Sequence, residues 1–116
     1  MPYIDGMVAA VPTANRAQYL THATAAAALF RKHGALQVVE TWGNDVPDGK
    51  LTSFPMAVKK ADDETVVFSW IVWPSKESHD TGWAGVMAEW ETANVGPMPF
   101  DGKRMIYGGF EVLLDA

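Results

Sequence analysis

The sequence predicts an α+β fold, because strand-like and helix-like segments alternate along a chain of 116 residues. Residues 15–34 and 75–90 each carry apolar side chains at spacings of three and four, which is typical of amphipathic helices. Residues 65–73 are apolar at both sets of alternating positions, as in a strand whose two faces are both covered. The length fits a single domain spanning residues 1–116.

The first half of the chain begins with a strand and a helix. We expect the strand over residues 3–11, because Pro12 cannot continue a ladder of backbone hydrogen bonds. Asn15 can cap the helix that follows. Cationic residues 31–33 and then Gly34 are typical of a helix C-terminus, where positive charge and a left-handed residue are favoured.

Two further strands are expected in the middle of the chain. Residues 36–42 are predicted to form one, and the Gly, Asn, Asp and Pro residues of 43–49 indicate a loop after it. Residues 50–57 are a weaker strand candidate, because Pro55 would interrupt a central strand. Residues 65–73 then form the third strand.

The last part of the chain completes a recognisable pattern. Ser75 can cap the second helix, residues 92–102 are an irregular connection, and residues 104–114 are the last strand. The order strand, helix, strand, strand, helix, strand is the ferredoxin-like βαββαβ pattern. It predicts a four-stranded antiparallel sheet in the order 4-1-3-2, with both helices on one face.

In such a fold the second face of the sheet is bare, and here it is apolar. Residues 65–73 place apolar side chains on both faces: Val66, Phe68, Trp70 and Val72 on one, and Val67, Ile71 and Trp73 on the other. Burying a large apolar side chain contributes roughly 1.5–3 kcal/mol, whereas association costs about 4–15 kcal/mol. Several such residues per subunit therefore favour a homodimer that forms through the sheet face.

Composition excludes several classes of partner. The net charge of −5 disfavours a nucleic-acid surface, which needs clustered cations. The chain has no Cys, no N-terminal signal pattern and no apolar stretch of about 18 residues.

The motifs do not indicate a metal or phosphate site. His22 and His33 lack a third ligand at metal-site spacing. Gly108 and Gly109 do not precede a helix, as the glycines of a phosphate-binding loop would. We expect a cytoplasmic protein with no cofactor, no metal, no nucleic-acid partner and no membrane partner.

Several strings also resemble a known family. They are a YIDG start at residues 3–6, HGA at 33–35, KLTSFP at 50–55, ETVVFSWIVWPS at 64–75 and MPFDGKRMIYGGFE at 98–111. Together they resemble the YbaA-like bacterial proteins, which are grouped as a domain of unknown function. The resemblance covers nearly the whole chain and implies a dimeric α+β barrel of ferredoxin-like domains. It implies no activity, substrate or catalytic residue.

The best candidate site is a pocket between the second helix and the sheet. His79 and Trp83 are one helical turn apart, so a titratable group stands beside an aromatic wall. We expect Trp73 as a second wall, Arg104 as an anchor and Tyr107 as a polar group. This set would bind a small, flat or anionic organic molecule.

Structural roles compete with each of these assignments. His79 can instead be a half-buried structural residue or a helix-capping residue. The tryptophans can instead pack in the core or at the interface. Arg104 or Lys103 can pair with Asp5 or Glu40, carboxylates in otherwise apolar strands. Two functional classes therefore remain: a small-molecule enzyme or binding protein, and a non-catalytic structural or interaction dimer.

Overall fold

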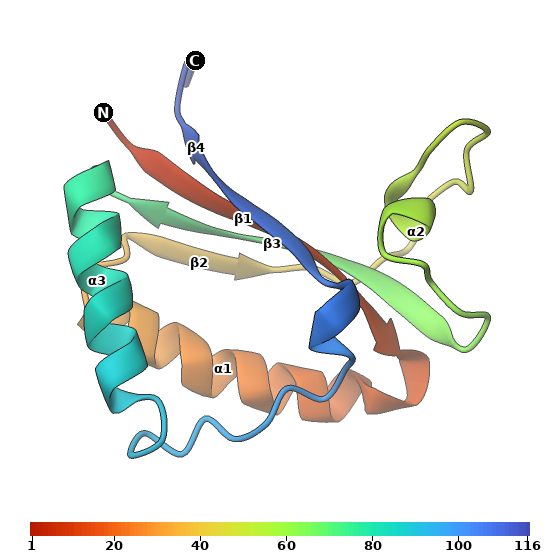
Figure 1. Cartoon of the computed structure of the whole chain (residues 1–116), viewed down its shortest axis with the longest axis horizontal. Helices are drawn as coiled ribbons and strands as arrows, with labels where there is room; N and C mark the ends of the chain where they lie inside the picture. Colours follow the sequence, from red (N-terminus) through yellow and green to blue (C-terminus); the bar gives the residue numbers. More distant parts are fainter.

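The computed structural model describes residues 1–116 and contains one four-stranded antiparallel sheet. The strands are β1 (Tyr3–Pro12), β2 (Gln37–Glu40), β3 (Glu64–Trp73) and β4 (Ile106–Glu111). The helices are α1 (Arg16–Lys32), α2 (Phe54–Ala57) and α3 (Lys76–Glu89), with short 3₁₀ turns η1 (Thr13–Asn15) and η2 (Gly102–Arg104). Figure 1 shows α1 and α3 on the same side of the sheet. None of the helices combines the length and the apolar character needed to cross a membrane.

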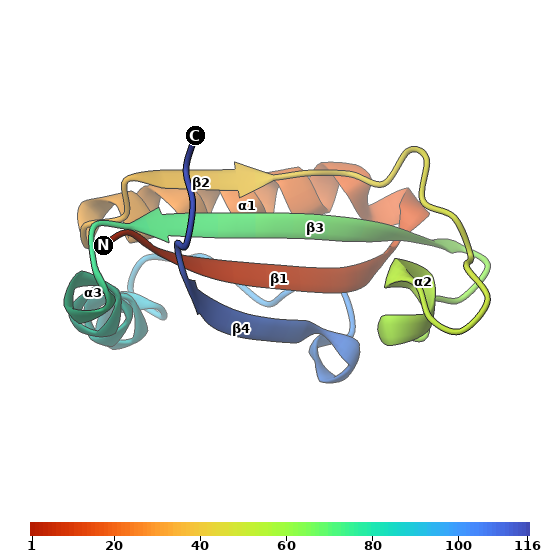
Figure 2. The ribbon, with the colours of Figure 1, turned by 90° about the horizontal axis from the view of Figure 1, so that it is seen from above.

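The two longest strands form the centre of the sheet. The order is β2-β3-β1-β4, which is 4-1-3-2 when read from β4 (Figure 2). β1 and β3 pair along their whole length, from Tyr3 opposite Trp73 to Pro12 opposite Glu64. The edge strands β2 and β4 are shorter. β4 spans only Ile106–Glu111, so residues 104–105 and 112–114 of the predicted strand 104–114 lie outside it.

The helix ends show which of the predicted caps form. Ser75 caps α3 as predicted, because its Oγ accepts a hydrogen bond from the Ser78 backbone N–H at 3.1 Å. Asn15 occupies the cap position of α1, but its side chain makes no capping bond and instead donates to the Pro99 carbonyl at 3.0 Å. Gly34 follows α1 with φ 109°, in the left-handed region expected after a helix.

The main core lies between the sheet and the helices α1 and α3. On β3, Ile71 and Trp73 point toward these helices, and both are almost completely buried. They pack with Phe30 from α1 and Val86 from α3. Since alternate residues of a strand face opposite sides, Val67 and Ser69 face the same side as Ile71.

The opposite face of the sheet is covered only at one end. Val58, directly after α2, packs against Val8, Ala10 and Val66. Helix α2 corrects the weak strand expected at residues 50–57, because Ser53 caps it and Pro55 falls in its first turn, where proline is tolerated.

Farther along this face, large apolar side chains remain accessible. Phe68, Ile106 and Phe110 are exposed by 43%, 44% and 59%. Within one chain the second face of β3 is therefore covered only in part.

Candidate functional site

A cavity of about 780 Å³ lies between α1, α3, the sheet and the connection that leads to β4. It is lined by 24 residues, of which 17 are hydrophobic, so its character is mainly apolar. Small side chains of α1, including Ala23, Ala26 and Ala27, face the space and leave room in it. The sheet contributes alternate residues of β3, namely Val67, Ser69 and Ile71, to the same cavity.

A tyrosine and a carboxyl group meet at the wall of this cavity. Tyr19 of α1 donates its hydroxyl to Glu40 Oε1 of β2 at an O···O distance of 2.5 Å. Ser69 stands opposite Glu40 in the pairing of β2 with β3. The three polar side chains therefore come from three different elements and converge at one place.

The surroundings of this pair alter the proton affinity of both groups. Desolvation raises the pKa of Glu40, although hydrogen bonds from Tyr19 and Ser69 act in the opposite direction. Desolvation and the neighbouring Glu40 charge raise the pKa of Tyr19. Glu40 is the last residue of the edge strand β2, and its side chain is accessible where it borders the cavity. A carboxyl group of this kind can exchange a proton or a hydrogen bond with a molecule in the cavity.

His22 adds a second polar group to the lining. Its Nδ1 lies 3.2 Å from the backbone oxygen of Val95. Because a carbonyl oxygen only accepts, Nδ1 carries the hydrogen, and the Nε2 of a neutral ring is then an acceptor. The ring packs against the edge of Trp90, which also lines the cavity.

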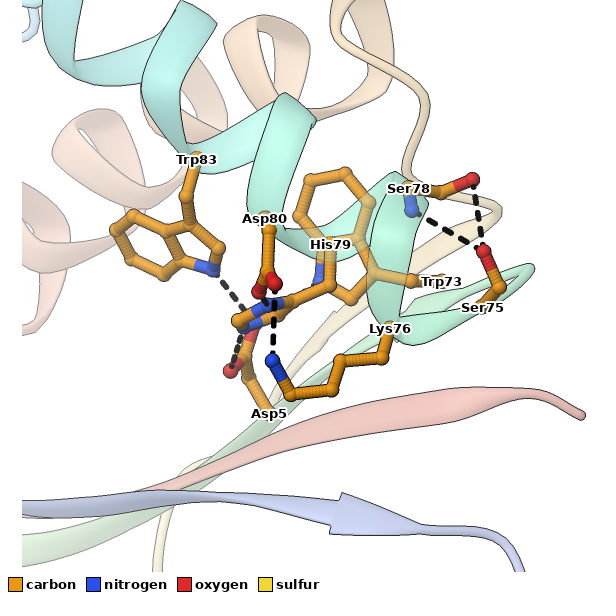
Figure 3. Close-up of polar contacts among 8 residues, drawn as sticks. All are labelled: Asp5, Trp73, Ser75, Lys76, Ser78, His79, Asp80 and Trp83. Carbon is orange, nitrogen blue, oxygen red and sulfur yellow. Dashed lines mark hydrogen bonds and ion pairs between the residues drawn. The ribbon is translucent and has the colours of Figure 1, made fainter.

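A separate polar cluster holds α3 against the sheet, and Figure 3 shows its members. The Asp5 carboxylate accepts hydrogen bonds from Trp73 Nε1 at 2.9 Å and Trp83 Nε1 at 2.8 Å. His79 Nε2 lies 2.9 Å from the other Asp5 oxygen, and its Nδ1 lies 2.7 Å from Asp80. We call Asp5, Trp73, His79 and Trp83 the Asp5 cluster. It satisfies the polar atoms of two large aromatic residues in and beside the core.

The structure separates the residues expected to form the site. Trp83 lines the cavity and also belongs to the Asp5 cluster. Trp73 and His79 belong to that cluster but are absent from the cavity lining. Tyr107 is 77% exposed on the edge strand β4 and is not in the lining either.

Arg104 lies in η2 and pairs with Glu64, with N···O distances of 2.6 and 2.8 Å, and with Asp101 at 3.0 Å. Its partner Glu64 pairs with Pro12 in the sheet, seven residues along β1 from Asp5. At about 3.3 Å per residue, that separation is roughly 23 Å. The structure therefore does not bring Arg104 to His79, and the carboxylates expected to pair with it have other partners.

Sequence reasoning missed several polar residues that border the cavity, among them Tyr19, His22, Glu40 and Ser69. A carboxylate in an apolar strand was the usable signal for Glu40. Its tyrosine partner lies 21 positions away on a helix, and no local spacing links the two.

The Glu64–Arg104 pair gives a pH-dependent contribution to stability. Hydrogen bonds from Arg104 lower the pKa of Glu64 from its ordinary value of 4.5 to about 2. The stabilisation is therefore complete above the unfolded value and is lost as the pH falls toward 2. We expect Glu64→Gln to lower the free energy of unfolding at neutral pH by about 1–2 kcal/mol, less than the full shift, because the Arg104 side chain is partly exposed to solvent.

Urea denaturation of wild type and Glu64→Gln between neutral pH and pH ~2.5 measures this effect. The difference in stability should shrink as the pH is lowered through this window. Glu111→Gln, on the exposed end of β4, serves as a control for a lost carboxylate. A difference in unfolding free energy that stays constant with pH would show that the Glu64–Arg104 pair does not cause this pH dependence.

Comparison with known proteins gives a family but no activity. The profile described as "Protein of unknown function (DUF1428)" matches residues 2–102. The "Uncharacterized protein YbaA" of Escherichia coli (strain K12) is 53% identical over 116 residues, covering 99% of each chain. The protein of the same name from Shigella flexneri has the same identity and coverage. This chain therefore belongs to the DUF1428 family.

Proposed function

We propose that this protein binds a small, mainly apolar organic molecule in the cavity between the sheet and the helices α1 and α3. The observation that carries the proposal is the cavity itself, with about 780 Å³ and a mainly hydrophobic lining. Small-molecule sites typically have volumes of roughly 300–1,000 Å³, apolar walls and a few convergent polar groups. The Glu40 and Tyr19 pair supplies such polar groups at one wall.

Within this proposal, the residues expected from the sequence have different roles. Trp83 is a wall of the site, and its indole orientation is fixed by the bond to Asp5. Trp73 and His79 act indirectly, because they contact the same Asp5 carboxylate, Trp73 at the oxygen that Trp83 also bonds and His79 at the other oxygen. Arg104 and Tyr107 lie outside the proposed site.

A probe that fluoresces in apolar surroundings tests the cavity. We expect the neutral probe N-phenyl-naphthylamine to bind wild type, and Ala26→Phe to weaken binding at least about tenfold by filling the space. Ala28→Phe adds the same bulk on the exposed side of α1 and should leave binding unchanged. No binding to wild type, or equal binding to both variants, would contradict the proposal.

The exposed apolar face of the sheet favours a second role, as a homodimer. Four large apolar side chains share this face. Phe68 and Trp70 are two residues apart on β3, and Ile106 and Phe110 are four residues apart on β4, so each pair points to one side. The pairing of both strands with β1 places the two pairs on the same face. An apolar surface of this kind on a soluble protein is typical of an interaction site. The partner we propose is a second copy of the chain, which would give the dimeric α+β barrel of ferredoxin-like domains. A dimer without ligand would be the structural or interaction module that is the alternative function.

Sedimentation velocity at low micromolar concentration tests the assembly. We expect wild type to sediment as a dimer, and Phe68→Glu to weaken the dimer by at least tenfold, because it buries a charge without a partner. Leu20→Glu changes another exposed apolar residue, on α1 and away from this face, and should remain dimeric. A single wild-type species of 12.7 kDa would rule the dimer out.

A further inference from the structure

We infer that the cavity selects ligands that carry a protonated amine, which is held by the Glu40 carboxylate. This inference rests on the proposed small-molecule site and names the chemical class of its ligand. It replaces the anionic ligand that an Arg104 anchor would have favoured, because Arg104 is bound to Glu64 and lies outside the cavity.

The charged residues of the lining have a single sign. Glu40 and Glu91 line the cavity, whereas no Lys or Arg does. An anionic ligand would therefore meet two carboxylates and no Lys or Arg, and the mainly apolar lining makes the repulsion stronger than in bulk water. A cationic ligand would meet the opposite charge at both positions.

The hydrogen-bonding groups agree with the charges. Tyr19 donates to Glu40 Oε1, and a carboxylate has about four acceptor positions on its two oxygens, so Glu40 can accept further hydrogen bonds from a ligand. The Nδ1 of His22 bonds the Val95 carbonyl, so in the neutral form of the ring Nε2 is an acceptor. The cavity thus presents acceptors, and the complementary ligand group is a donor. An ammonium group has three donors and forms charge-assisted hydrogen bonds with a carboxylate.

The aromatic residues of the lining also suit a cation. Phe30, Trp83, Trp90 and Phe100 all line the cavity. The faces of such rings attract an ammonium group, and the attraction is stronger where the group is desolvated. Burial raises the pKa of Glu40, and no Lys or Arg in the cavity lining opposes this effect. A bound ammonium supplies that missing cation.

Four ligands on one carbon frame separate charge from shape: phenethylamine, phenethyl alcohol, phenylacetate and ethylbenzene. We measure their binding to wild type by isothermal titration calorimetry at neutral pH. The amine should bind at least about tenfold more tightly than phenylacetate and more tightly than the alcohol. Equal affinities of the amine and the alcohol would overturn the requirement for a cation.

Three variants connect the preference to Glu40. Glu40→Gln keeps the shape and removes the charge, so the preference for the amine over the alcohol should disappear. Glu77→Gln makes the same charge change on the exposed first turn of α3 and should keep the preference. Glu40→Thr removes the charge with a residue that suits a strand, so it should also lose the preference, which provides a second readout if Glu40→Gln folds poorly.

The outcomes distinguish the inference from the function on which it rests. If ethylbenzene and the other three ligands all fail to bind, the small-molecule site itself is wrong. If ethylbenzene binds while the amine has no advantage over phenylacetate, the cavity stands and the amine selectivity is wrong. A preference for the amine that survives in Glu40→Gln would also overturn the role of Glu40.

Discussion

Replacing Asp5 with alanine is expected to lower the free energy of unfolding by about 3–5 kcal/mol. The carboxylate is buried and accepts hydrogen bonds from the indoles of Trp73 and Trp83, and it contacts His79 at 2.9 Å. Its removal leaves three polar groups without their acceptor where protein excludes much of the water. The loss should appear as a lower midpoint of urea denaturation with an unchanged slope.

Two further variants make the Asp5 result interpretable. Asp62→Ala removes a carboxylate from an exposed turn, and its effect should lie within about 0.5 kcal/mol. Asp5→Asn keeps the size of the side chain and one acceptor oxygen, but its NH₂ group faces N–H donors in place of the second oxygen. Its loss of unfolding free energy should therefore be intermediate. If Asp5→Ala costs less than about 1 kcal/mol, the cluster does not anchor α3 as described.

Replacing Gly82 with alanine is expected to lower the free energy of unfolding by about 2–3 kcal/mol. In most helices this change is favourable by about 0.8–1 kcal/mol, because alanine has the higher helix propensity. Here an added Cβ would lie 2.2 Å from Trp73 Cζ3 and 2.8 Å from the backbone oxygen of His33. The buried ring cannot move aside without disturbing the Asp5 cluster, so overpacking outweighs propensity.

The reverse change at a neighbouring position is the matched control. Ala84 lies on the exposed side of the same helix, where only propensity acts. Ala84→Gly should therefore cost about 1 kcal/mol. Thermal and urea denaturation of both variants give the comparison. A Gly82→Ala protein that is more stable than wild type would show that α3 does not pack as closely on Trp73 as the structure indicates.

Local patterns in the sequence predict much of the fold. The central strand at residues 65–73 and the Ser75 cap follow from patterns within a few residues, and the structure contains both. The cap expected from Asn15 does not form, because residues 13–15 form a 3₁₀ turn that runs directly into α1, and the Asn15 amide donates to the Pro99 carbonyl instead. Helix α2 was missed because four residues are too few to show helical periodicity.

The candidate site was harder to predict because its residues meet only in three dimensions. His79 and Trp83 share a helix face, and that local spacing placed them correctly beside one another. Their shared acceptor is Asp5, which lies at the other end of the chain and which the sequence had paired with Arg104 or Lys103. Glu40 likewise meets Tyr19 rather than either of those cations. Partner choice among distant charged residues depends on strand register, which no local pattern specifies.

The strand order also affects how the chain emerges from a ribosome. β1 is made first but lies in the middle of the sheet, and both of its neighbours, β3 and β4, follow much later. About 50 residues separate the end of β1 from the start of β3, so at 5–20 residues per second the wait is roughly 3–10 s. During that time an apolar strand has two unpaired edges, the condition that favours aggregation. The nascent chain is therefore most in need of a chaperone or a ribosomal surface before residue 73 has appeared.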